Sequence, residues 1–204
     1  MNPHSLFAAA ALTCAAFAPG AFAAPAIGAP APDFSLPDSS GGTQSLSQHK
    51  GETVVLEWSN PGCPFVQKHY SSGNIPKQQA DATRGGVIWL TINSGAPGKQ
   101  GYLDAAGAKT FIAQYHASPS AYLFDAEGKV GHLYGATNTP QLFVIDAGGI
   151  LRYKGAIDSI ASADKEDLAK ATQYVPQALA ELKAGKPVSV PVSQPYGCSV
   201  KYGS

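Results

Sequence analysis

The sequence has no excess of charge of either sign. Among its 204 residues, 14 are Lys or Arg and 14 are Asp or Glu, so the formal net charge is zero, and neither sign forms a run. Proteins that bind nucleic acid or anionic membranes need a basic surface. The charge balance therefore argues against both functions and is compatible with an uncharged or small substrate.

The amino-terminal part lacks charged side chains, and the first one is Asp33. The apolar stretch over residues 6–17 is about a dozen residues long, whereas a membrane span needs about 20. A short apolar core followed by small residues is typical of a secretory signal peptide. We predict that residues 1–23 form a signal peptide cleaved near Ala23, which makes the mature protein periplasmic or secreted, with no membrane span. Lipid attachment at Cys14 is disfavoured because the preceding residues match the usual signal poorly.

Cysteines are few. Cys14 lies in the predicted signal peptide, so the mature chain keeps only Cys63 and Cys198. An oxidising compartment would permit these two residues to form a disulfide. The count alone leaves open whether such a pair is structural or catalytic.

Three nearly continuous apolar runs are typical of strands buried on both faces of a sheet. They span residues 53–58, 87–92 and 141–145. A Gly-rich turn joins the third run to residues 150–154, which predicts a hairpin. Residues 33–37 and 43–46 flank a turn cluster and predict an amino-terminal hairpin.

Helices are predicted between these strands, over residues 64–70 and 108–116. A carboxy-terminal helix is predicted from a stripe with spacings of four, three, four and three, formed by Leu168, Thr172, Val175, Leu179 and Leu182. Pro176 lies inside the stripe and should kink the helix or restart it. The alternation of strands and helices predicts an α/β fold with a mixed sheet.

The mature chain has about 180 residues, which is enough for one domain with a single core. We predict a flexible lead-in over residues 24–32 and a domain over residues 33–185. Residues 186–204 are rich in Pro, Val, Ser and Gly without helical periodicity, and they predict an extended tail that carries Cys198.

The most informative residue is Cys63. It follows a buried strand and a turn that ends in Gly62, and Pro64 marks the first position of the next helix. A cysteine at a helix N-terminus faces free N–H groups and the positive end of the helix dipole, and both favour the thiolate. Lys68 and His69 could add positive potential. We predict a reactive thiol; the alternative is a buried, inert cysteine.

Four segments resemble the redoxin superfamily, which includes the alkyl hydroperoxide reductase and thiol-specific antioxidant family. The resemblance is greatest to a thioredoxin-like, peroxiredoxin-related subgroup. The segments span residues 31–37, 50–58, 60–64 and 135–140. The resemblance implies a thioredoxin-like fold, in which helices flank a central mixed β-sheet and the amino-terminal hairpin is an extension.

The active-site motif departs from that family at several positions. The subgroup usually has Cys-x-x-Cys, whereas here Asn60 stands at the first position and Cys63 at the second. True peroxiredoxins carry Pro-x-x-x-Thr/Ser-x-x-Cys, and the first two of those positions hold Leu56 and Asn60. For the partner Arg, Arg152 is the one nearby candidate. Peroxide and protein disulfide both stay open as substrates.

The resemblance also implies a substrate site. In the thioredoxin fold a cis-proline precedes the last hairpin and packs against the active cysteine, so the Thr139–Pro140 bond is expected to be cis. The residues implied in substrate binding are Asn60, Gly62, Pro64, Thr139 and Pro140. The Gly-rich residues 96–101 are expected at the carboxyl end of the 87–92 strand, on the same rim as Cys63.

Cys198 lies in the tail beside Gly197 and between two tyrosines. As a resolving cysteine, it would attack a sulfenic acid or a mixed disulfide on Cys63 and convert it to a disulfide. Two alternatives stay open for Cys198: a permanent structural disulfide with Cys63, and a free or partner-linked thiol.

We therefore expect an exported thiol-dependent oxidoreductase, with Cys63 as nucleophile and Cys198 as resolving residue. An exported thioredoxin-like protein would be its reductant, and no cofactor is expected. One rival is a redox-inert thioredoxin-fold binding module with a structural disulfide. The other is a copper chaperone that uses Cys63 and His69, although the Cys-x-x-x-Cys pair of such chaperones is absent. No metal site is expected from the scattered His49, His116 and His132.

Overall fold

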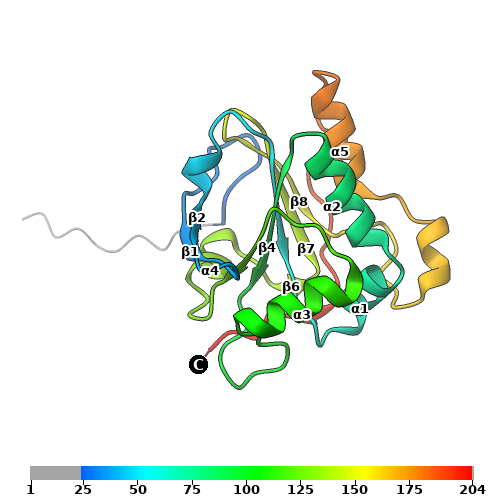
Figure 1. Ribbon diagram of the computed structural model, residues 1–204. Helices are drawn as coiled ribbons and strands as arrows, with labels where there is room; N and C mark the ends of the chain where they lie inside the picture. Colours follow the sequence, from blue (N-terminus) through cyan, green and yellow to red (C-terminus); the bar gives the residue numbers. More distant parts are fainter. Residues whose placement is uncertain (1–23, 204) are drawn as a thin grey trace, which may run out of the picture.

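A five-stranded mixed sheet forms the centre of the computed structural model, which describes residues 24–203 (Figure 1). The predicted signal peptide lies outside the described residues. The strand order is β5–β4–β3–β7–β8, in which β3, β4 and β5 are parallel and β7 and β8 are antiparallel to their neighbours. The strands are β3 (Val54–Trp58), β4 (Ile88–Asn93), β5 (Ala121–Phe124), β7 (Gln141–Ile145) and β8 (Leu151–Gly155). The predicted α/β fold with a mixed sheet is confirmed.

The three apolar runs form the middle of this sheet. Every residue of β3 and β7 is buried, as expected for strands covered on both faces. Strand β5, four residues at the sheet edge beside β4, was not predicted from the sequence. So short an element carries little periodicity.

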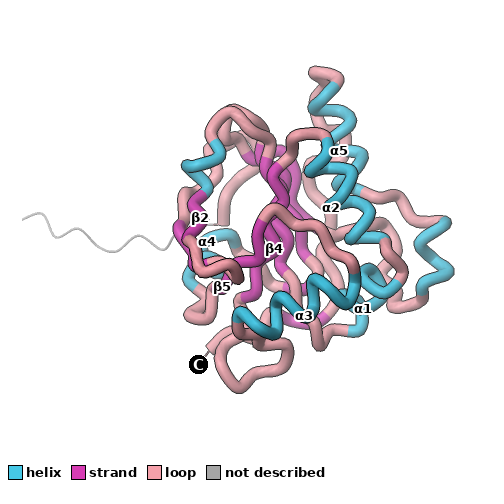
Figure 2. The backbone as a smooth tube through the Cα atoms, viewed as in Figure 1, coloured by secondary structure: helices cyan, strands magenta, loops and turns pink. Residues whose placement is uncertain are grey.

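Two different layers cover the sheet (Figure 2). On one face lie α4 (Lys129–Tyr134) and the amino-terminal hairpin of β1 (Ser35–Pro37) and β2 (Thr43–Ser45). A 3₁₀ turn over Leu46–His49 follows the hairpin. The other face carries the remaining helices: α1 (Pro64–Ser71), α2 (Asn74–Arg84), α3 (Ala105–Tyr115) and α5 (Tyr174–Lys183). The predicted hairpin extension is confirmed.

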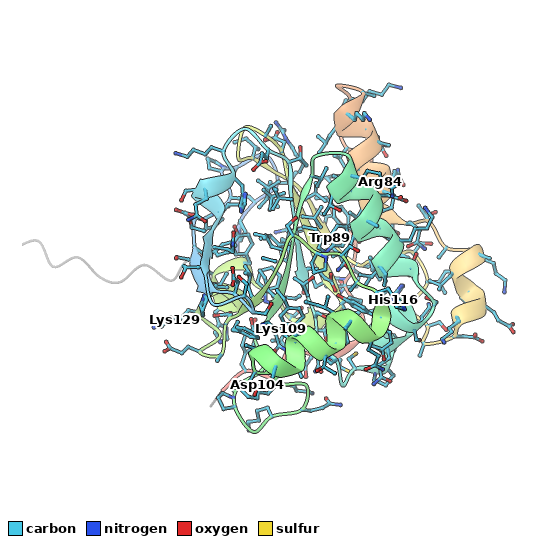
Figure 3. The ribbon with its side chains drawn as sticks, in the orientation of Figure 1. Arg84, Trp89, Asp104, Lys109, His116 and Lys129 are labelled. Atoms are coloured by element: carbon cyan, nitrogen blue, oxygen red, sulfur yellow. The ribbon has the colours of Figure 1, made fainter. Side chains whose placement is uncertain are left out.

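Helix α2 was not predicted, because its buried face mixes the amides Gln78 and Gln79 with apolar residues. Gln79 is fully buried there, and its side-chain amide donates to Glu57 Oε2 over 3.1 Å. Trp89, whose side chain lies between the sheet and α2 (Figure 3), also donates to Glu57 Oε2, over 2.8 Å. With Tyr70 OH and Thr91 Oγ1 as further donors, Glu57 forms a polar centre inside an apolar layer. Burial raises the pKa of this carboxyl, although the four donors oppose the shift.

The carboxy-terminal helix is shorter than the stripe predicted. Leu168 belongs to a separate 3₁₀ turn over Lys165–Ala169, and Thr172 lies in the exposed connection that follows. Helix α5 begins at Tyr174, so Pro176 occupies its first turn, where a missing N–H is tolerated. Pro176 was expected either to kink the helix or to restart it, and the structure shows a new helix that begins at Tyr174.

Both terminal segments are more firmly attached than expected. Residues 24–32, expected as a flexible lead-in, are hydrogen-bonded to β8: Gly28 N–H donates to Leu151 O over 2.8 Å, and Leu151 N–H donates to Ala29 O over 3.0 Å. The tail is extended, as predicted, but it docks into the fold, because β9 (Cys198–Ser199) pairs antiparallel with β6 (Asn138–Thr139). Within residues 24–203, no helix is both long enough and apolar enough to cross a membrane.

Candidate functional site

Cys63 is the N-cap of α1, and Pro64 is the first residue of that helix. The Cys63 carbonyl accepts from Gln67 N–H over 2.9 Å, and the Cys63 N–H donates to Asn60 O over 2.9 Å. Both bonds fix the cysteine at the junction of turn and helix, as the sequence predicts. The Cys63 side chain is nevertheless fully covered, with 0% of the residue exposed.

Both β6 and the carboxy-terminal tail contact the Cys63 sulfur. The Cys63 thiol donates to Thr139 O of β6 over 3.2 Å, and Cys198 N–H of the tail donates to Cys63 Sγ over 3.4 Å. Burial by itself would raise the pKa of Cys63. Hydrogen bonds from the Cys198 thiol and from the N–H groups of Val66, Cys198 and Phe65 outweigh it, so the pKa lies below its usual value. The Cys63 sulfur is therefore disposed to be a thiolate.

Cys198 has the opposite tendency. Burial, its hydrogen bond to Cys63 and the charge of Cys63 raise the pKa of Cys198 to about 11. Both cysteines are reduced in the structure, with Cys198 half-buried. Cys198 therefore keeps its proton and donates it towards the Cys63 thiolate.

Strand pairing holds the tail at this place (Figure 1). Cys198 is paired with Thr139, and Asn138 Nδ2 donates to Gly197 O over 3.0 Å. Gly197 has a φ of +106°, and a Cβ atom there would lie 2.2 Å from Thr139 O. Only glycine permits this approach of the two backbones. Cys198 thus reaches Cys63 of its own chain.

Asn60 supports the turn before Cys63. Its Oδ1 accepts from Gly62 N–H over 2.8 Å, and the residue is 5% exposed. The 96–101 segment closes the same rim, as predicted, because Gln100 Nε2 donates to Gly62 O over 2.8 Å. Asn60 therefore acts as a turn cap at the position where the resembling subgroup has its first cysteine.

Four of the five predicted substrate-binding residues lie close to Cys63, three of them in the chain and one through a spatial contact. Asn60, Gly62 and Pro64 flank it, with Pro64 exposed on the surface, and Thr139 contacts its sulfur. The Thr139–Pro140 bond is cis, as the resemblance implies. The carbonyl of Thr139, a residue implied in substrate binding, faces Cys63.

Lys68 and His69 do not supply positive potential to Cys63. Lys68 Nζ donates to Ser162 O over 2.8 Å. Burial lowers the pKa of His69 to about 4, with Asp158 opposing and Lys68 reinforcing the shift, so its ring is neutral near pH 7. Both side chains lie near the buried Asp158, with Lys68 Nζ at 4.0 Å and His69 Nε2 at 3.8 Å from its Oδ2.

Two residues of this region, Asp158 and Tyr196, were not predicted from the sequence. The Tyr196 hydroxyl donates to Asp158 Oδ1 over 2.5 Å and lies 3.2 Å from His69 Nε2. The sequence shows that Tyr196 is two positions from Cys198, but it does not show what the Tyr196 hydroxyl contacts. Asp158 follows β8 and had no local signal.

Arg152, the candidate for the peroxiredoxin partner Arg, does not lie near Cys63. Arg152 Nε donates to Asp146 Oδ2 over 2.6 Å, beside the β7–β8 turn. In the sheet, that end of β7 pairs with Val54, whereas Trp58 at the other end of β3 leads to Cys63. Arg152 is therefore at the wrong end of the sheet to serve as the partner Arg.

Among residues 24–203, no group of three or more His, Cys, Asp or Glu side chains could hold a metal ion. Both ring nitrogens of His69 are engaged, Nδ1 at 2.8 Å from Asn74 Nδ2 and Nε2 with Tyr196 OH. The Cys63 and His69 pair considered for copper is thus already satisfied by protein groups.

One groove of about 970 Å³ runs between α2 and α5. It borders Gly51 and Gly148, at the end of the sheet opposite to Cys63. Cys63 does not line this groove, so the groove gives no access to its sulfur.

The fold and the site together define a redoxin of the thioredoxin fold: a buried strand, a turn, a cysteine capping a helix, and a cis-proline beside its sulfur. The chain belongs to the AhpC/TSA family, whose model matches residues 27–154. No curated protein matches the sequence.

Solved structures share the fold. A hypothetical protein from Sinorhizobium meliloti 1021 is 26% identical, with a TM-score of 0.72, over 88% of this chain and 96% of the other. An uncharacterized conserved protein from Geobacillus kaustophilus is 23% identical, with a TM-score of 0.72, over 87% and 93%. A candidate thiol:disulfide interchange protein DsbE from Chlorobium tepidum is 27% identical, with a TM-score of 0.54, over 72% and 95%.

Proposed function

We propose that the protein is an exported thiol–disulfide oxidoreductase whose redox couple is Cys63 and Cys198. The observation that carries this proposal is the contact between the two thiols, in which the pKa of Cys63 is lowered and that of Cys198 is raised. A nucleophile and a proton donor are thereby held together. The name of the Chlorobium tepidum neighbour, a thiol:disulfide interchange protein, agrees with this chemistry.

The reaction has two exchange steps. The Cys63 thiolate attacks one sulfur of a substrate disulfide, forming a mixed disulfide and releasing the other sulfur as a thiolate. Cys198 then loses its proton to solvent and attacks Cys63 Sγ. The Cys63–Cys198 bond forms, the bond to the substrate breaks, and the second substrate thiolate leaves. Two electrons pass from the protein dithiol to the substrate.

The cycle needs a dithiol donor to restore the two thiols. The predicted signal peptide places the protein outside the cytoplasm, so an exported thioredoxin-like protein is the proposed reductant. Because Cys63 is 0% exposed while the tail is docked, a substrate disulfide must displace the tail before the first step. Movement of the tail is thus part of the proposed cycle.

The test compares the wild-type protein with C63S and C198S in the catalysed exchange between glutathione and a small disulfide. We expect C63S to show only the uncatalysed rate. C198S, treated with the small disulfide in the absence of glutathione, should react once and stop as a mixed disulfide on Cys63, identified by peptide mapping. A wild-type Cys63–Cys198 disulfide that resists reduction, with no catalysed exchange, would instead identify the redox-inert binding module.

A hydroperoxide is the second candidate oxidant, favoured by membership of the AhpC/TSA family. Against it stands the absence of the peroxiredoxin Pro and Thr, whose positions hold Leu56 and Asn60. Hydrogen peroxide added to C198S should then give a sulfenic acid on Cys63, trapped by a dimedone-type reagent. If peroxide consumes no thiol while disulfides do, the peroxidase alternative is excluded.

A further inference from the structure

Tyr196 anchors the tail two residues before Cys198. Its hydroxyl donates to Asp158 Oδ1 over 2.5 Å, and its ring packs against Phe65 with 5.6 Å between the ring centroids. Phe65 belongs to α1, the helix that Cys63 caps. Tyr196 therefore ties the tail to the same helix that holds the nucleophilic sulfur.

The hydrogen bonds around the hydroxyl have a single consistent direction. Asn74 Nδ2 also donates to Gln173 Oε1 over 3.0 Å, which identifies it as the amide nitrogen, so it donates to His69 Nδ1 as well. The proton of the neutral His69 ring then lies on Nε2 and points at the Tyr196 oxygen. The Tyr196 hydroxyl in turn donates its hydrogen bond to Asp158 Oδ1.

The acceptor is a buried group for which the tail supplies a specific donor. Asp158 is 1% exposed, its Oδ2 has no hydrogen-bond partner, and its Oδ1 otherwise accepts only Ile160 N–H, over 3.1 Å, among the hydrogen bonds of the described residues. A hydrogen bond to such a carboxylate is stronger than one between neutral groups. Release of the tail breaks this bond.

We propose that Tyr196 is a positioning residue: seated between Asp158 and His69, it fixes the register of the tail so that Cys198 meets Cys63. The inference rests on the proposed function, because it assigns to Tyr196 control of the step in which Cys198 attacks Cys63. Tyr196 also controls the exposure of Cys63, because the tail must release its hydroxyl before a substrate can reach the sulfur.

The chain offers a matched control in Tyr202. It lies in the same tail, beyond Cys198, and its hydroxyl donates to Ala136 O over 2.7 Å. Y196F and Y202F each remove one hydroxyl from a docked ring. Y196F removes the hydrogen bond to Asp158, made by a residue that precedes Cys198 in the tail. Y202F removes the hydrogen bond to Ala136, made by a residue that follows Cys198.

Two measurements test the assignment in the reduced full chain. The first is the rate at which iodoacetamide alkylates Cys63, read by mass spectrometry of its peptide. We expect Y196F to raise this rate about tenfold or more, since loss of a hydrogen bond to a charged partner increases tail opening by that factor, and Y202F to change it by less than about twofold. The second is the rate at which Cys198 displaces glutathione from Cys63, which Y196F should lower and Y202F should not.

A purely structural role for Tyr196 would reduce stability but leave both rates alike in the two variants, and that result overturns the proposal. D158N supplies a second, independent variant: it replaces the charged acceptor and should move both rates in the same direction as Y196F. If Y196F exposes Cys63 as expected but the wild-type protein catalyses no disulfide exchange, the proposed function fails while the control of the tail by Tyr196 stands. If exchange occurs and Y196F behaves like Y202F, the function stands and the role of Tyr196 is rejected.

Discussion

The backbone N–H of Cys198 donates to the Sγ atom of Cys63 over 3.4 Å, although 135 positions separate the two residues in the chain. In a Cys-x-x-Cys motif, the second sulfur comes from the same turn as the first. Here Asn60 occupies the turn position and uses its side chain to cap Gly62 N–H. The pairing of β6 with β9 therefore brings in the sulfur that the local motif lacks.

The thiol of Cys198 should control the acidity of Cys63. We expect C198A to raise the pKa of Cys63, because the side-chain donor from Cys198 is lost. C198S keeps a hydroxyl donor and should stay closer to the wild-type value. Ultraviolet absorbance of the thiolate, followed against pH, measures this pKa. Identical curves for wild type and C198A would contradict the assigned cause.

In the oxidised protein, glutathione should attack Cys198. Cys198 is the more accessible sulfur, and Cys63, with the lower pKa, is the better leaving group. The expected product is glutathione on Cys198 and a free Cys63 thiolate, found by peptide mapping after a brief reaction and acid quench. Predominant modification of Cys63 would show that the oxidised site opens differently.

Gly197 should be needed for docking of the tail. In G197A the new Cβ would lie 2.2 Å from Thr139 O, at a φ of +106°. Overpacking of this kind costs about 1–3 kcal/mol, so we expect formation of the Cys63–Cys198 disulfide to slow by about tenfold or more. G203A is the matched control, since its Cβ would meet only Ala96 Cβ at 3.6 Å. Equal rates in the two variants would count against docking through β6.

The stability of the fold should depend on pH through His69. Burial lowers the pKa of His69 from 6.5 to about 4. Between these two values the unfolded state binds more protons, so the contribution is fully present above pH 6.5 and is lost as pH falls through about 4. It amounts to at most about 3 kcal/mol.

Urea unfolding at pH 7 and pH 4.5 measures this effect. We expect the free energy of unfolding of H69Q to change less between the two pH values than that of the wild type. H116N is the control, because His116 is exposed and in the left-handed region, which Asn tolerates. If H69Q keeps the full wild-type pH dependence, other groups cause it.

Local patterns in the sequence were sufficient for much of the fold. The three central strands were evident because each is a nearly continuous apolar run and is almost entirely buried. Cys63 could be placed at a helix start because Pro64 follows it, and the resemblance supplied the cis bond before Pro140. In contrast, α2 was hidden because its buried face carries Gln79, which pairs with a buried Glu57.

The missing parts of the site depend on contacts between distant segments. Asp158 and Tyr196 are polar residues in irregular segments, and their partnership becomes visible only when α1 and the tail are placed together. Lys68 and His69 follow Cys63 closely in the chain, which suggested a role at the thiol. The helical rotation directs both of them to Asp158 instead.

The pairing of the tail with β6 has a topological consequence. A bond between Cys63 and Cys198 would close a covalent ring that contains four strands of the central sheet, since only β3 precedes it. In the chain-entropy model, a ring of 136 residues, counted inclusively from the 135-position separation, restricts the unfolded chain by about 5 kcal/mol. The free energy of unfolding would then depend on the redox state of the two cysteines. Each turnover that reduces the disulfide would open the ring and lower the stability of the native state.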